Sequence, residues 1–309
     1  MRFKKLDLNL LVALDHMIEL RSVSAAADRM FMSQSAMSNA LTRLRDYFDD
    51  PLLVQVGRRM EVTPRAEAMR PAIRDILVRI EATIDAHPEF QPDQSTRTFN
   101  ILLSDYSMRV LMPSVFQRIA AQNATIKINL HAQTDLPQVL LERGEIDLLI
   151  SPEIFMSDEH PSALLYEDNY VVAAWKGGTY GDVDMDQATF ETASHAVMIP
   201  PGTVKSVEAS LLEKAGIKRN IDVQTFSFSV LPHLITGTDR IATIHGRLAR
   251  LIAPQAELVT YPMPHILPPL RQMIQWHAYR DNDPGLNWLK STIEDAAVQL
   301  DDPFTKPIN

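Results

Sequence analysis

The stretch from residue 22 to residue 48 constrains the fold most strongly, because it contains two amphipathic segments joined by a tight turn. In the first segment the apolar residues recur at helical spacing, at Val23, Ala26, Ala27 and Met30. Ser33 stands at the start of the second segment, where its hydroxyl can cap the free N–H groups of a new helix. That helix has an apolar face made of Met37, Ala40, Leu41, Leu44 and Phe48. Small residues at 25–27 let two helices cross closely, so the stretch is typical of a helix-turn-helix.

The opposite face of the second predicted helix carries polar side chains that can reach DNA. Gln and Asn can form two hydrogen bonds with adenine, Ser is an adaptable donor and acceptor, and Arg binds phosphate. We therefore predict contacts with double-stranded DNA from Ser33, Gln34, Ser35, Ser38, Asn39 and Thr42, with Arg43 and Arg45 as phosphate anchors. The alternative is a helix face that is merely solvated.

Two short β-prone runs follow within residues 52–63, on either side of a Gly-Arg-Arg sequence. They predict a small hairpin, or wing, whose Arg58 and Arg59 reach the DNA backbone or the minor groove. A plain surface hairpin is the alternative. Together with a first helix over residues 6–20, these elements predict an all-α winged helix-turn-helix domain over residues 1–65.

A long helix is predicted from Pro64 to about Asp85, because apolar residues recur there close to a heptad spacing. The stripe consists of Met69, Ile73, Ile76, Leu77, Ile80 and Ile84. Its narrow and continuous form favours a helix that pairs two subunits, and we assign residues 66–90 to a linker and dimerisation helix. A surface helix packed on its own domain is the alternative.

The charge of the chain is divided unevenly. The whole chain has a net charge of −9, whereas residues 1–66 hold ten basic and eight acidic residues, a net charge of +2. Phosphate would repel the acidic remainder, and a weakly basic domain would need more than one copy for tight DNA binding. Polar residues interrupt the N-terminal apolar stretch, so we expect neither a signal peptide nor a membrane partner. The absence of cysteine agrees with a cytoplasmic location.

A segment rich in Pro, Gln and Ser at 87–97 predicts a domain boundary, beyond which β-prone runs alternate with helical patterns. Such alternation implies parallel α/β sheets. The predicted strands cover 98–103, 126–130, 147–151, 163–175, 195–199, 221–226, 240–244 and 272–279. We predict two Rossmann-like lobes, as in periplasmic binding proteins, within residues 91–309: lobe I from about 91–163 and 271–300, and lobe II from about 164–270. Ligands of such folds lie in the crevice between the lobes.

Several motifs resemble those of the LysR-type transcriptional regulators, over essentially the whole chain. The stretch SAAADRMFMSQSAMSNALTRLR, the wing end RRMEVTP and the later LERGEIDLLIS carry this resemblance. The opening RFKKLDLNLLVALDHMI, with LSDYSMRVLMP, SPEIFMSDEHP and MIQWHAYR, is most similar to rhizobial nodulation regulators and salicylate-responsive naphthalene-degradation regulators. The resemblance implies a transcriptional activator, a homodimer or a homotetramer built as a dimer of dimers, and an effector between the lobes. One departure is Phe31, because a left-handed turn residue there suits Gly or a small polar residue better.

The resemblance also places an effector site at the strand ends that face the crevice. The implied residues are Ser104, Asp105, Tyr106, Asn169, Gly202, Thr203, Lys205, Phe226, Phe228 and Met273. A helix start beside Lys205 would hold an acidic or phenolic group, and the aromatic side chains would hold a ring. We therefore expect a small aromatic or phenolic effector. The alternatives are ordinary core positions for Phe226, Phe228 and Met273, and a solvated helix start for Lys205.

We interpret the chain as an effector-responsive regulator that binds palindromic promoter DNA, with RNA polymerase as a further candidate partner. Two other classes were weighed: a solute-binding protein without a DNA role, and an enzyme acting on a small aromatic acid. The chain has no GxGxxG, P-loop, HExxH or GxSxG motif, and its nine histidines are scattered. We therefore expect no catalytic residues, no cofactor and no metal.

Overall fold

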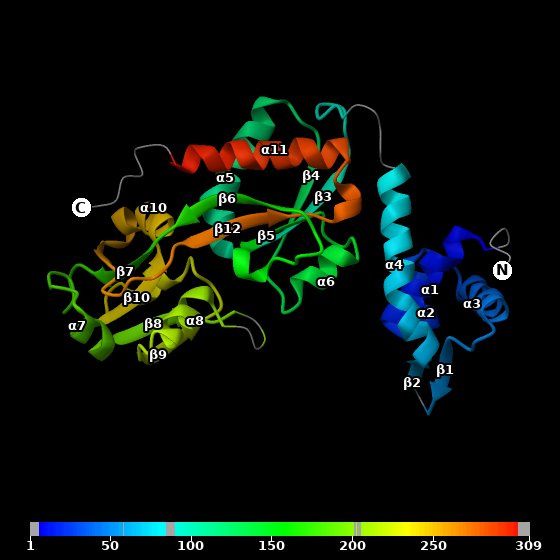
Figure 1. Ribbon diagram of the computed structural model, residues 1–309, viewed down its shortest axis with the longest axis horizontal. Helices are drawn as coiled ribbons and strands as arrows, with labels where there is room; N and C mark the ends of the chain where they lie inside the picture. The colour runs from blue at the N-terminus through cyan, green and yellow to red at the C-terminus, as the bar shows by residue number, and fades with distance from the viewer. Residues whose placement is uncertain (1–5, 58, 85–89, 201, 203–204, 302–309) are drawn as a thin grey trace. The chain divides into compact units, whose positions relative to one another are not determined.

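The computed structural model describes residues 6–57, 59–84, 90–200, 202 and 205–301, coloured along the chain in Figure 1. The chain divides into two compact units. The first comprises residues up to 86 with a short segment at 142–144, and the second comprises the rest of the chain. Within the described ranges, no helix is long and apolar enough to cross a membrane.

The first unit contains the predicted helices and hairpin in the predicted order. Its elements are α1 (Leu8–Leu20), α2 (Val23–Arg29), α3 (Gln34–Phe48), β1 (Leu53–Val56), β2 (Arg59–Val62) and α4 (Pro64–Ile84). Ser33 caps α3 as expected, because its Oγ accepts a hydrogen bond from the Ala36 N–H at 3.2 Å. The apolar faces of the helices form one core, in which Leu14, Met17 and Leu44 are fully buried.

The turn between α2 and α3 has a strained residue at its centre. Phe31 has a φ of 53°, in the left-handed region that the sequence marks as unfavourable for this residue. Its ring is 98% exposed, so packing within the described part of the unit does not offset the strain. The next residue, Met32, donates its backbone N–H to the Ala27 carbonyl at 2.9 Å and so completes the turn.

Helix α4 packs against the core of its own unit with part of the predicted stripe. Ile73 is buried, and Met69 and Leu77 pack partly buried against the same core. Ile76, by contrast, is 43% exposed. The stripe therefore divides between packing inside the unit and an exposed edge, and pairing of two subunits through this helix stays a prediction.

The second unit contains two mixed sheets. In the first, the parallel strands β3, β4 and β5 are extended by β12, which runs antiparallel to both β5 and β6. Helices α5 (Asp105–Ala121) and α11 (Pro284–Val298) pack against each other, and Figure 1 shows them side by side. In spatial order the strands are β4 (Lys127–His131), β3 (Thr98–Leu103), β5 (Leu148–Pro152), β12 (Leu270–Gln275) and β6 (Ser162–Asp168).

Alternate residues of β3 explain how helices cover both faces of this sheet. Ile101 and Leu103 belong to the main core with α5 and α11, whereas Leu102 lies in a small cluster with Leu141 of α6 (Pro137–Glu142). This period of two is the expected pattern for a strand buried on both sides.

The second sheet has the same design. Strand β8 runs parallel to β9 and β10, and β7 runs antiparallel to β10 and β11. In spatial order the strands are β11 (Leu258–Pro262), β7 (Tyr170–Trp175), β10 (Arg240–His245), β8 (Ser194–Met198) and β9 (Asn220–Thr225). The associated helices are α7 (Gln187–Thr192), α8 (Val207–Lys214), α9 (Leu231–Ile235) and α10 (Gly246–Ala256).

The expected α/β class with two lobes is confirmed, but two details of it are wrong. The sheets are mixed rather than parallel. Strand β12 runs antiparallel to β5 and β6, and β7 runs antiparallel to β10. The β-prone stretch at 163–175 is two strands, and the chain passes from the first sheet to the second at Asn169. We did not predict α7, α10 or β11.

Candidate functional site

The polar face of α3 is open to solvent along its length. Ser33, Gln34, Ser35, Ser38, Asn39, Thr42 and Arg43 are all exposed, while Met37, Ala40, Leu41 and Leu44 are buried on the other face. Among the described residues, no side-chain partner engages Gln34, Asn39 or Arg43, so their hydrogen-bonding groups are available to a ligand. One helix therefore presents amide, hydroxyl and guanidinium groups together.

Arg45 has a different position from the one expected of a phosphate anchor. Its Nε donates to the Pro51 carbonyl at 2.8 Å, and its Nη2 donates to the Leu53 carbonyl at 2.7 Å. These bonds fix the loop that leads into the hairpin, so the guanidinium positions the wing. Arg59 is exposed on β2, and Arg58 lies outside the described residues.

Two acidic residues follow α3, close to the face that would meet DNA, and the structure explains them. Asp49 adopts the left-handed conformation that ends the helix. The Asp50 carboxylate accepts bonds from the Leu52 N–H and the Thr63 hydroxyl, both at 2.7 Å. These bonds hold the pKa of Asp50 below its ordinary value. Both acids therefore have a local structural role.

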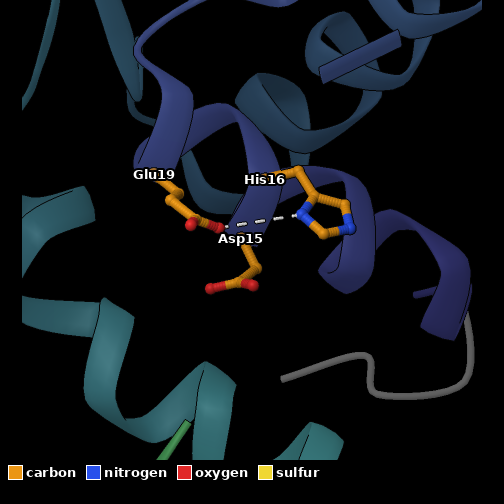
Figure 2. A group of neighbouring side chains, drawn as sticks. All are labelled: Asp15, His16 and Glu19. Carbon is orange, nitrogen blue, oxygen red and sulfur yellow. Dashed lines mark ion pairs between the residues drawn. The ribbon is translucent and has the colours of Figure 1, made fainter. Parts of the chain in front are cut away.

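Three potential metal ligands lie together on α1: Asp15, His16 and Glu19, drawn in Figure 2. Arg74 of α4 forms ion pairs with Asp15 and, at 3.0 Å, with Glu19. Burial raises the pKa of the Asp15 carboxyl, and Arg74 beside it acts in the opposite direction. Because a guanidinium already neutralises both carboxylates, the group serves as an ion-pair network that ties α4 to α1.

A second candidate site lies between the two lobes of the second unit, as a narrow cavity of about 40 Å³. Three of the expected effector residues line it: Ser104, Tyr106 and Phe228. Tyr170, which follows Asn169 and was a further candidate for this site, also lines it. The other lining residues were not predicted: Gln133, Pro152, Phe155, Met198, Pro200, Ser206, Val207, Glu208, His245, Leu270 and Gln272. Several of them end a strand or follow one, so a systematic reading of every strand end would have found them.

Aromatic rings and buried polar atoms define the cavity wall. The Tyr106 hydroxyl donates to Asp168 at 2.6 Å, and its ring stacks on His245 with centroids 3.9 Å apart. Burial lowers the pKa of His245 to about 3, so the imidazole is neutral. In the described part of the chain, the Tyr170 hydroxyl and the His245 Nδ1 are buried without a hydrogen-bond partner. A ligand or a water molecule in the cavity could satisfy these two atoms.

One carboxyl group, that of Glu208, lies in the cavity wall. Glu208 is 7% exposed, and its carboxylate accepts bonds from Arg219 and, at 3.0 Å, from the Ser206 hydroxyl. Burial raises the pKa of this carboxyl, while Arg219 opposes the shift. No Lys or Arg belongs to the described lining of the cavity. A bound anion would therefore have no direct cationic partner there.

Asp105, which was expected to contact the effector, instead joins the two lobes. Its carboxylate accepts hydrogen bonds from the Ser227 hydroxyl at 2.6 Å and from the Ser229 N–H and hydroxyl at 2.8 Å. The Phe228 N–H also donates to it, at 3.2 Å. Bonds from a carboxylate to four donors across the lobes hold the cavity in its narrow form.

Other expected effector residues lie away from this cavity. Lys205 is exposed and its Nζ pairs with Glu213 at 2.6 Å, and Phe226 is 81% exposed. Asn169 is exposed and lines a different cavity. Met273 is buried where β12 pairs with β5 and β6, as a core position.

Gly202 makes one close contact between the lobes. Gly202 has a φ of 77°, and an added Cβ would lie 2.5 Å from the carboxyl carbon of Asp135. Gly is therefore required there for backbone reasons. It does not line the cavity between the lobes, and Thr203 lies outside the described residues.

Comparisons with known proteins identify the family to which both parts of the chain are similar. Residues 8–67 match the family model of the bacterial regulatory helix-turn-helix protein, lysR family, and residues 92–297 match the LysR substrate binding domain. Nodulation protein D 1 of Mesorhizobium japonicum is 38% identical over 98% of this chain and 97% of its own length. Nodulation protein D 3 of Rhizobium meliloti is 40% identical, with coverage of 98% and 97%. A probable transcriptional regulator from Pseudomonas aeruginosa has a TM-score of 0.65 at 28% identity, covering 94% of this chain and 97% of its own.

Proposed function

The chain belongs to the LysR family of DNA-binding transcriptional regulators, and we propose that it activates transcription when a neutral phenolic compound binds between its lobes. Membership of this family replaces the two other classes considered, the solute-binding protein and the enzyme. The similarity to the nodulation proteins supports activation. It also supports action in the cytoplasm on promoter DNA, as a dimer or tetramer that contacts RNA polymerase.

The single observation that carries the effector class is the pair of unpartnered polar atoms in an aromatic cavity. The Tyr170 hydroxyl and the neutral His245 imidazole can donate to and accept from a phenolic hydroxyl. Tyr106 and Phe228 supply ring surfaces for an aromatic body.

The same wall disfavours a carboxylate effector. A buried anion needs a cationic or strongly hydrogen-bonding partner, and the described lining contains neither Lys nor Arg. Lys205, which would have held an acid, is paired with Glu213 at the surface. The expectation therefore narrows from an aromatic or phenolic acid to an uncharged phenol.

Binding of such a molecule requires the lobes to move. A cavity of about 40 Å³ is smaller than an aromatic compound, so the bonds between Asp105 and the loop at 227–229 must rearrange as the ligand enters. An effector shifts an equilibrium only through different affinities for two states, and the narrow and widened cavities provide them.

The effector class is tested with a matched pair, 4-hydroxybenzamide and 4-hydroxybenzoate. Each is titrated into the whole protein by calorimetry at neutral pH. We expect the neutral amide to bind about tenfold more tightly or better, because burying an unpaired charge costs several kcal/mol. Tighter binding of the carboxylate would contradict the proposal.

The DNA contacts are tested separately by fluorescence anisotropy at a fixed salt concentration, with DNA flanking the gene and with random duplex. Gln34→Ala should reduce discrimination between the two by about 1–3 kcal/mol, because Gln reads base edges. Arg43→Ala should weaken both about equally, because phosphate contacts carry no sequence information. Equal loss on both duplexes for Gln34→Ala would remove base reading from this helix.

A further inference from the structure

A larger cavity, of about 490 Å³, lies in the second lobe and shares only Tyr170 with the cavity between the lobes. We propose that it binds a small organic carboxylate with an apolar body. Its walls come from the crossing segment at 167–171, the first turns of α10, strand β11 and the segment at 263–267. The volume lies within the range of sites that hold small molecules.

One side of this cavity is apolar. Val171, Met263, Leu267 and Ile266 line it, and Ile266 is fully exposed. A large aliphatic side chain in full contact with water has no packing role in the described structure. A ligand with an aliphatic or aromatic body would remove this surface from water, at about 25 cal/mol for each Å².

The polar side of the cavity has two nitrogen groups without partners. The described chain offers the half-buried Arg250 guanidinium neither a hydrogen bond nor an ion pair. The His265 Nε2 is buried and also lacks a hydrogen-bond partner among those residues. A planar guanidinium binds a carboxylate through two parallel hydrogen bonds, so these groups favour a carboxylate head.

The acidic residues that line the same cavity have hydrogen-bond or ion-pair partners other than Arg250, although Asp168 also interacts electrostatically with Arg250. Asp168 accepts bonds from the Tyr106 hydroxyl at 2.6 Å and from the Arg247 N–H at 3.1 Å. Glu167 lies 3.7 Å from the Arg271 Nε. Arg247 also lines the cavity, but its guanidinium donates to the carbonyls of Leu300 and Glu167. Arg250 is thus the lining cation whose guanidinium has no hydrogen bond in the described structure.

Position links this site with the effector cavity. The crossing segment separates the two, with Tyr170 in both walls and Asp168 bonded to Tyr106 of the effector cavity. A carboxylate bound beside Arg250 would therefore contact the crossing segment at 167–171, which connects the two lobes. The inference does not depend on the effector class, because the two cavities have different linings.

Methionine methyl NMR on the whole protein distinguishes the two cavities. Met263 lines the proposed site and Met198 lines the cavity between the lobes. We expect octanoate to shift the Met263 methyl signal and to leave the Met198 signal in place, whereas octanamide should bind at least about tenfold more weakly. A shift at Met198 alone, or equal binding of the acid and the amide, would overturn the proposal.

Two variants test the residues that carry it. Arg250→Gln should weaken octanoate binding about tenfold, while Arg240→Gln, which removes a half-buried arginine paired with Asp222, should leave it unchanged. Ile266→Glu changes a fully exposed side chain, so the fold should be retained. The negative charge that it adds at the rim of the cavity should also weaken the binding of octanoate. Equal effects of Arg250→Gln and Arg240→Gln, or no effect of Ile266→Glu, would contradict the site.

Discussion

The polar face of α3 and the cavity between the lobes present their functional groups in opposite ways. On α3, Gln34, Asn39 and Arg43 stand in solvent, where water satisfies them until DNA arrives. In the cavity, the Tyr170 hydroxyl and His245 Nδ1 are buried with no partner in the described structure. An unsatisfied buried group costs about 1–3 kcal/mol, whereas an exposed one costs almost nothing. The polar face of α3 is therefore neutral for stability, whereas the two buried atoms of the cavity lower stability until a ligand or a water satisfies them.

The comparison also extends to what holds each site in shape. In the first unit, which contains α3, the ion pairs of Arg74 hold α4 against α1. In the second unit, the hydrogen bonds of Asp105 hold the two lobes together around the cavity. Substitution of Arg74 or Asp105 should therefore have larger effects on stability at neutral pH than substitution of His245 or Phe31.

The largest expected effect is on the first unit. Arg74→Leu leaves Asp15, which is 2% exposed, without its ion-pair partner. Loss of one member of a buried pair costs about 3–5 kcal/mol of unfolding free energy. Hydrogen exchange measured by mass spectrometry on α1 peptides should report it. The control Arg79→Leu removes an exposed ion pair with Asp75 and should cost less than about 1 kcal/mol of unfolding free energy. Equal losses for Arg74→Leu and Arg79→Leu would contradict the role given to Arg74.

A smaller effect is expected when the bridge between the lobes is weakened. Asp105→Asn replaces a carboxylate that accepts from Ser227, Phe228 and Ser229 by an amide with one acceptor oxygen. We expect a loss of about 2 kcal/mol, because hydrogen bonds to charged groups are worth about 1.5–3 kcal/mol. Urea unfolding followed by tryptophan fluorescence reports it, since every Trp lies in the second unit. A stability unchanged from wild type would show that Asp105 does not hold the lobes.

Acid should destabilise the second unit through its buried histidines. The pKa of His245 is about 3 in the folded chain, against an ordinary value of 6.5, so the unfolded chain binds an extra proton between these pH values. Each buried histidine of this kind should lower stability by about 1.4 kcal/mol for each pH unit between 6.5 and its pKa in the folded chain. His245→Gln should reduce this slope and leave the contribution of His195, whose pKa is about 4. An identical slope in the variant would mean that His245 is protonated in the folded state.

The smallest effect concerns the turn before α3. Phe31→Asn should stabilise the first unit by about 1 kcal/mol, because Asn tolerates the left-handed backbone better than Phe. Phe31→Ala keeps the strained conformation and removes only an exposed ring, so its stability should stay close to that of wild type. Thermal unfolding compares the three proteins, and equal gains from Asn and Ala would place the cost in the ring.

The sequence predicts the two regions with different success for a physical reason. Ser33, Gln34 and Asn39 lie on one short helix, where spacing alone fixes which residues share a face. The cavity gathers residues from many segments, and Glu208 or His245 cannot be placed there without the topology of the sheets. Ser104 and Tyr106 were found because they lie in a family motif, and Phe228 because it follows the end of a predicted strand.

Some individual roles could not be read from residue type. Arg45 looks like Arg43 in the sequence, but it is turned toward the carbonyls of Pro51 and Leu53. Lys205 has the charge expected of an anion site, yet Glu213 lies at bonding distance on the next helix. In both cases the local partner, which depends on tertiary structure, decides the role.

The central claim is that the unpartnered Tyr170 hydroxyl is retained for the effector. Calorimetric titration of the whole protein with 4-hydroxybenzamide, for wild type and Tyr170→Phe, tests it most directly, with urea unfolding of both proteins alongside. We predict that Tyr170→Phe weakens binding about tenfold and raises the stability of the empty protein by about 1–2 kcal/mol. Unchanged affinity together with unchanged stability would contradict the account.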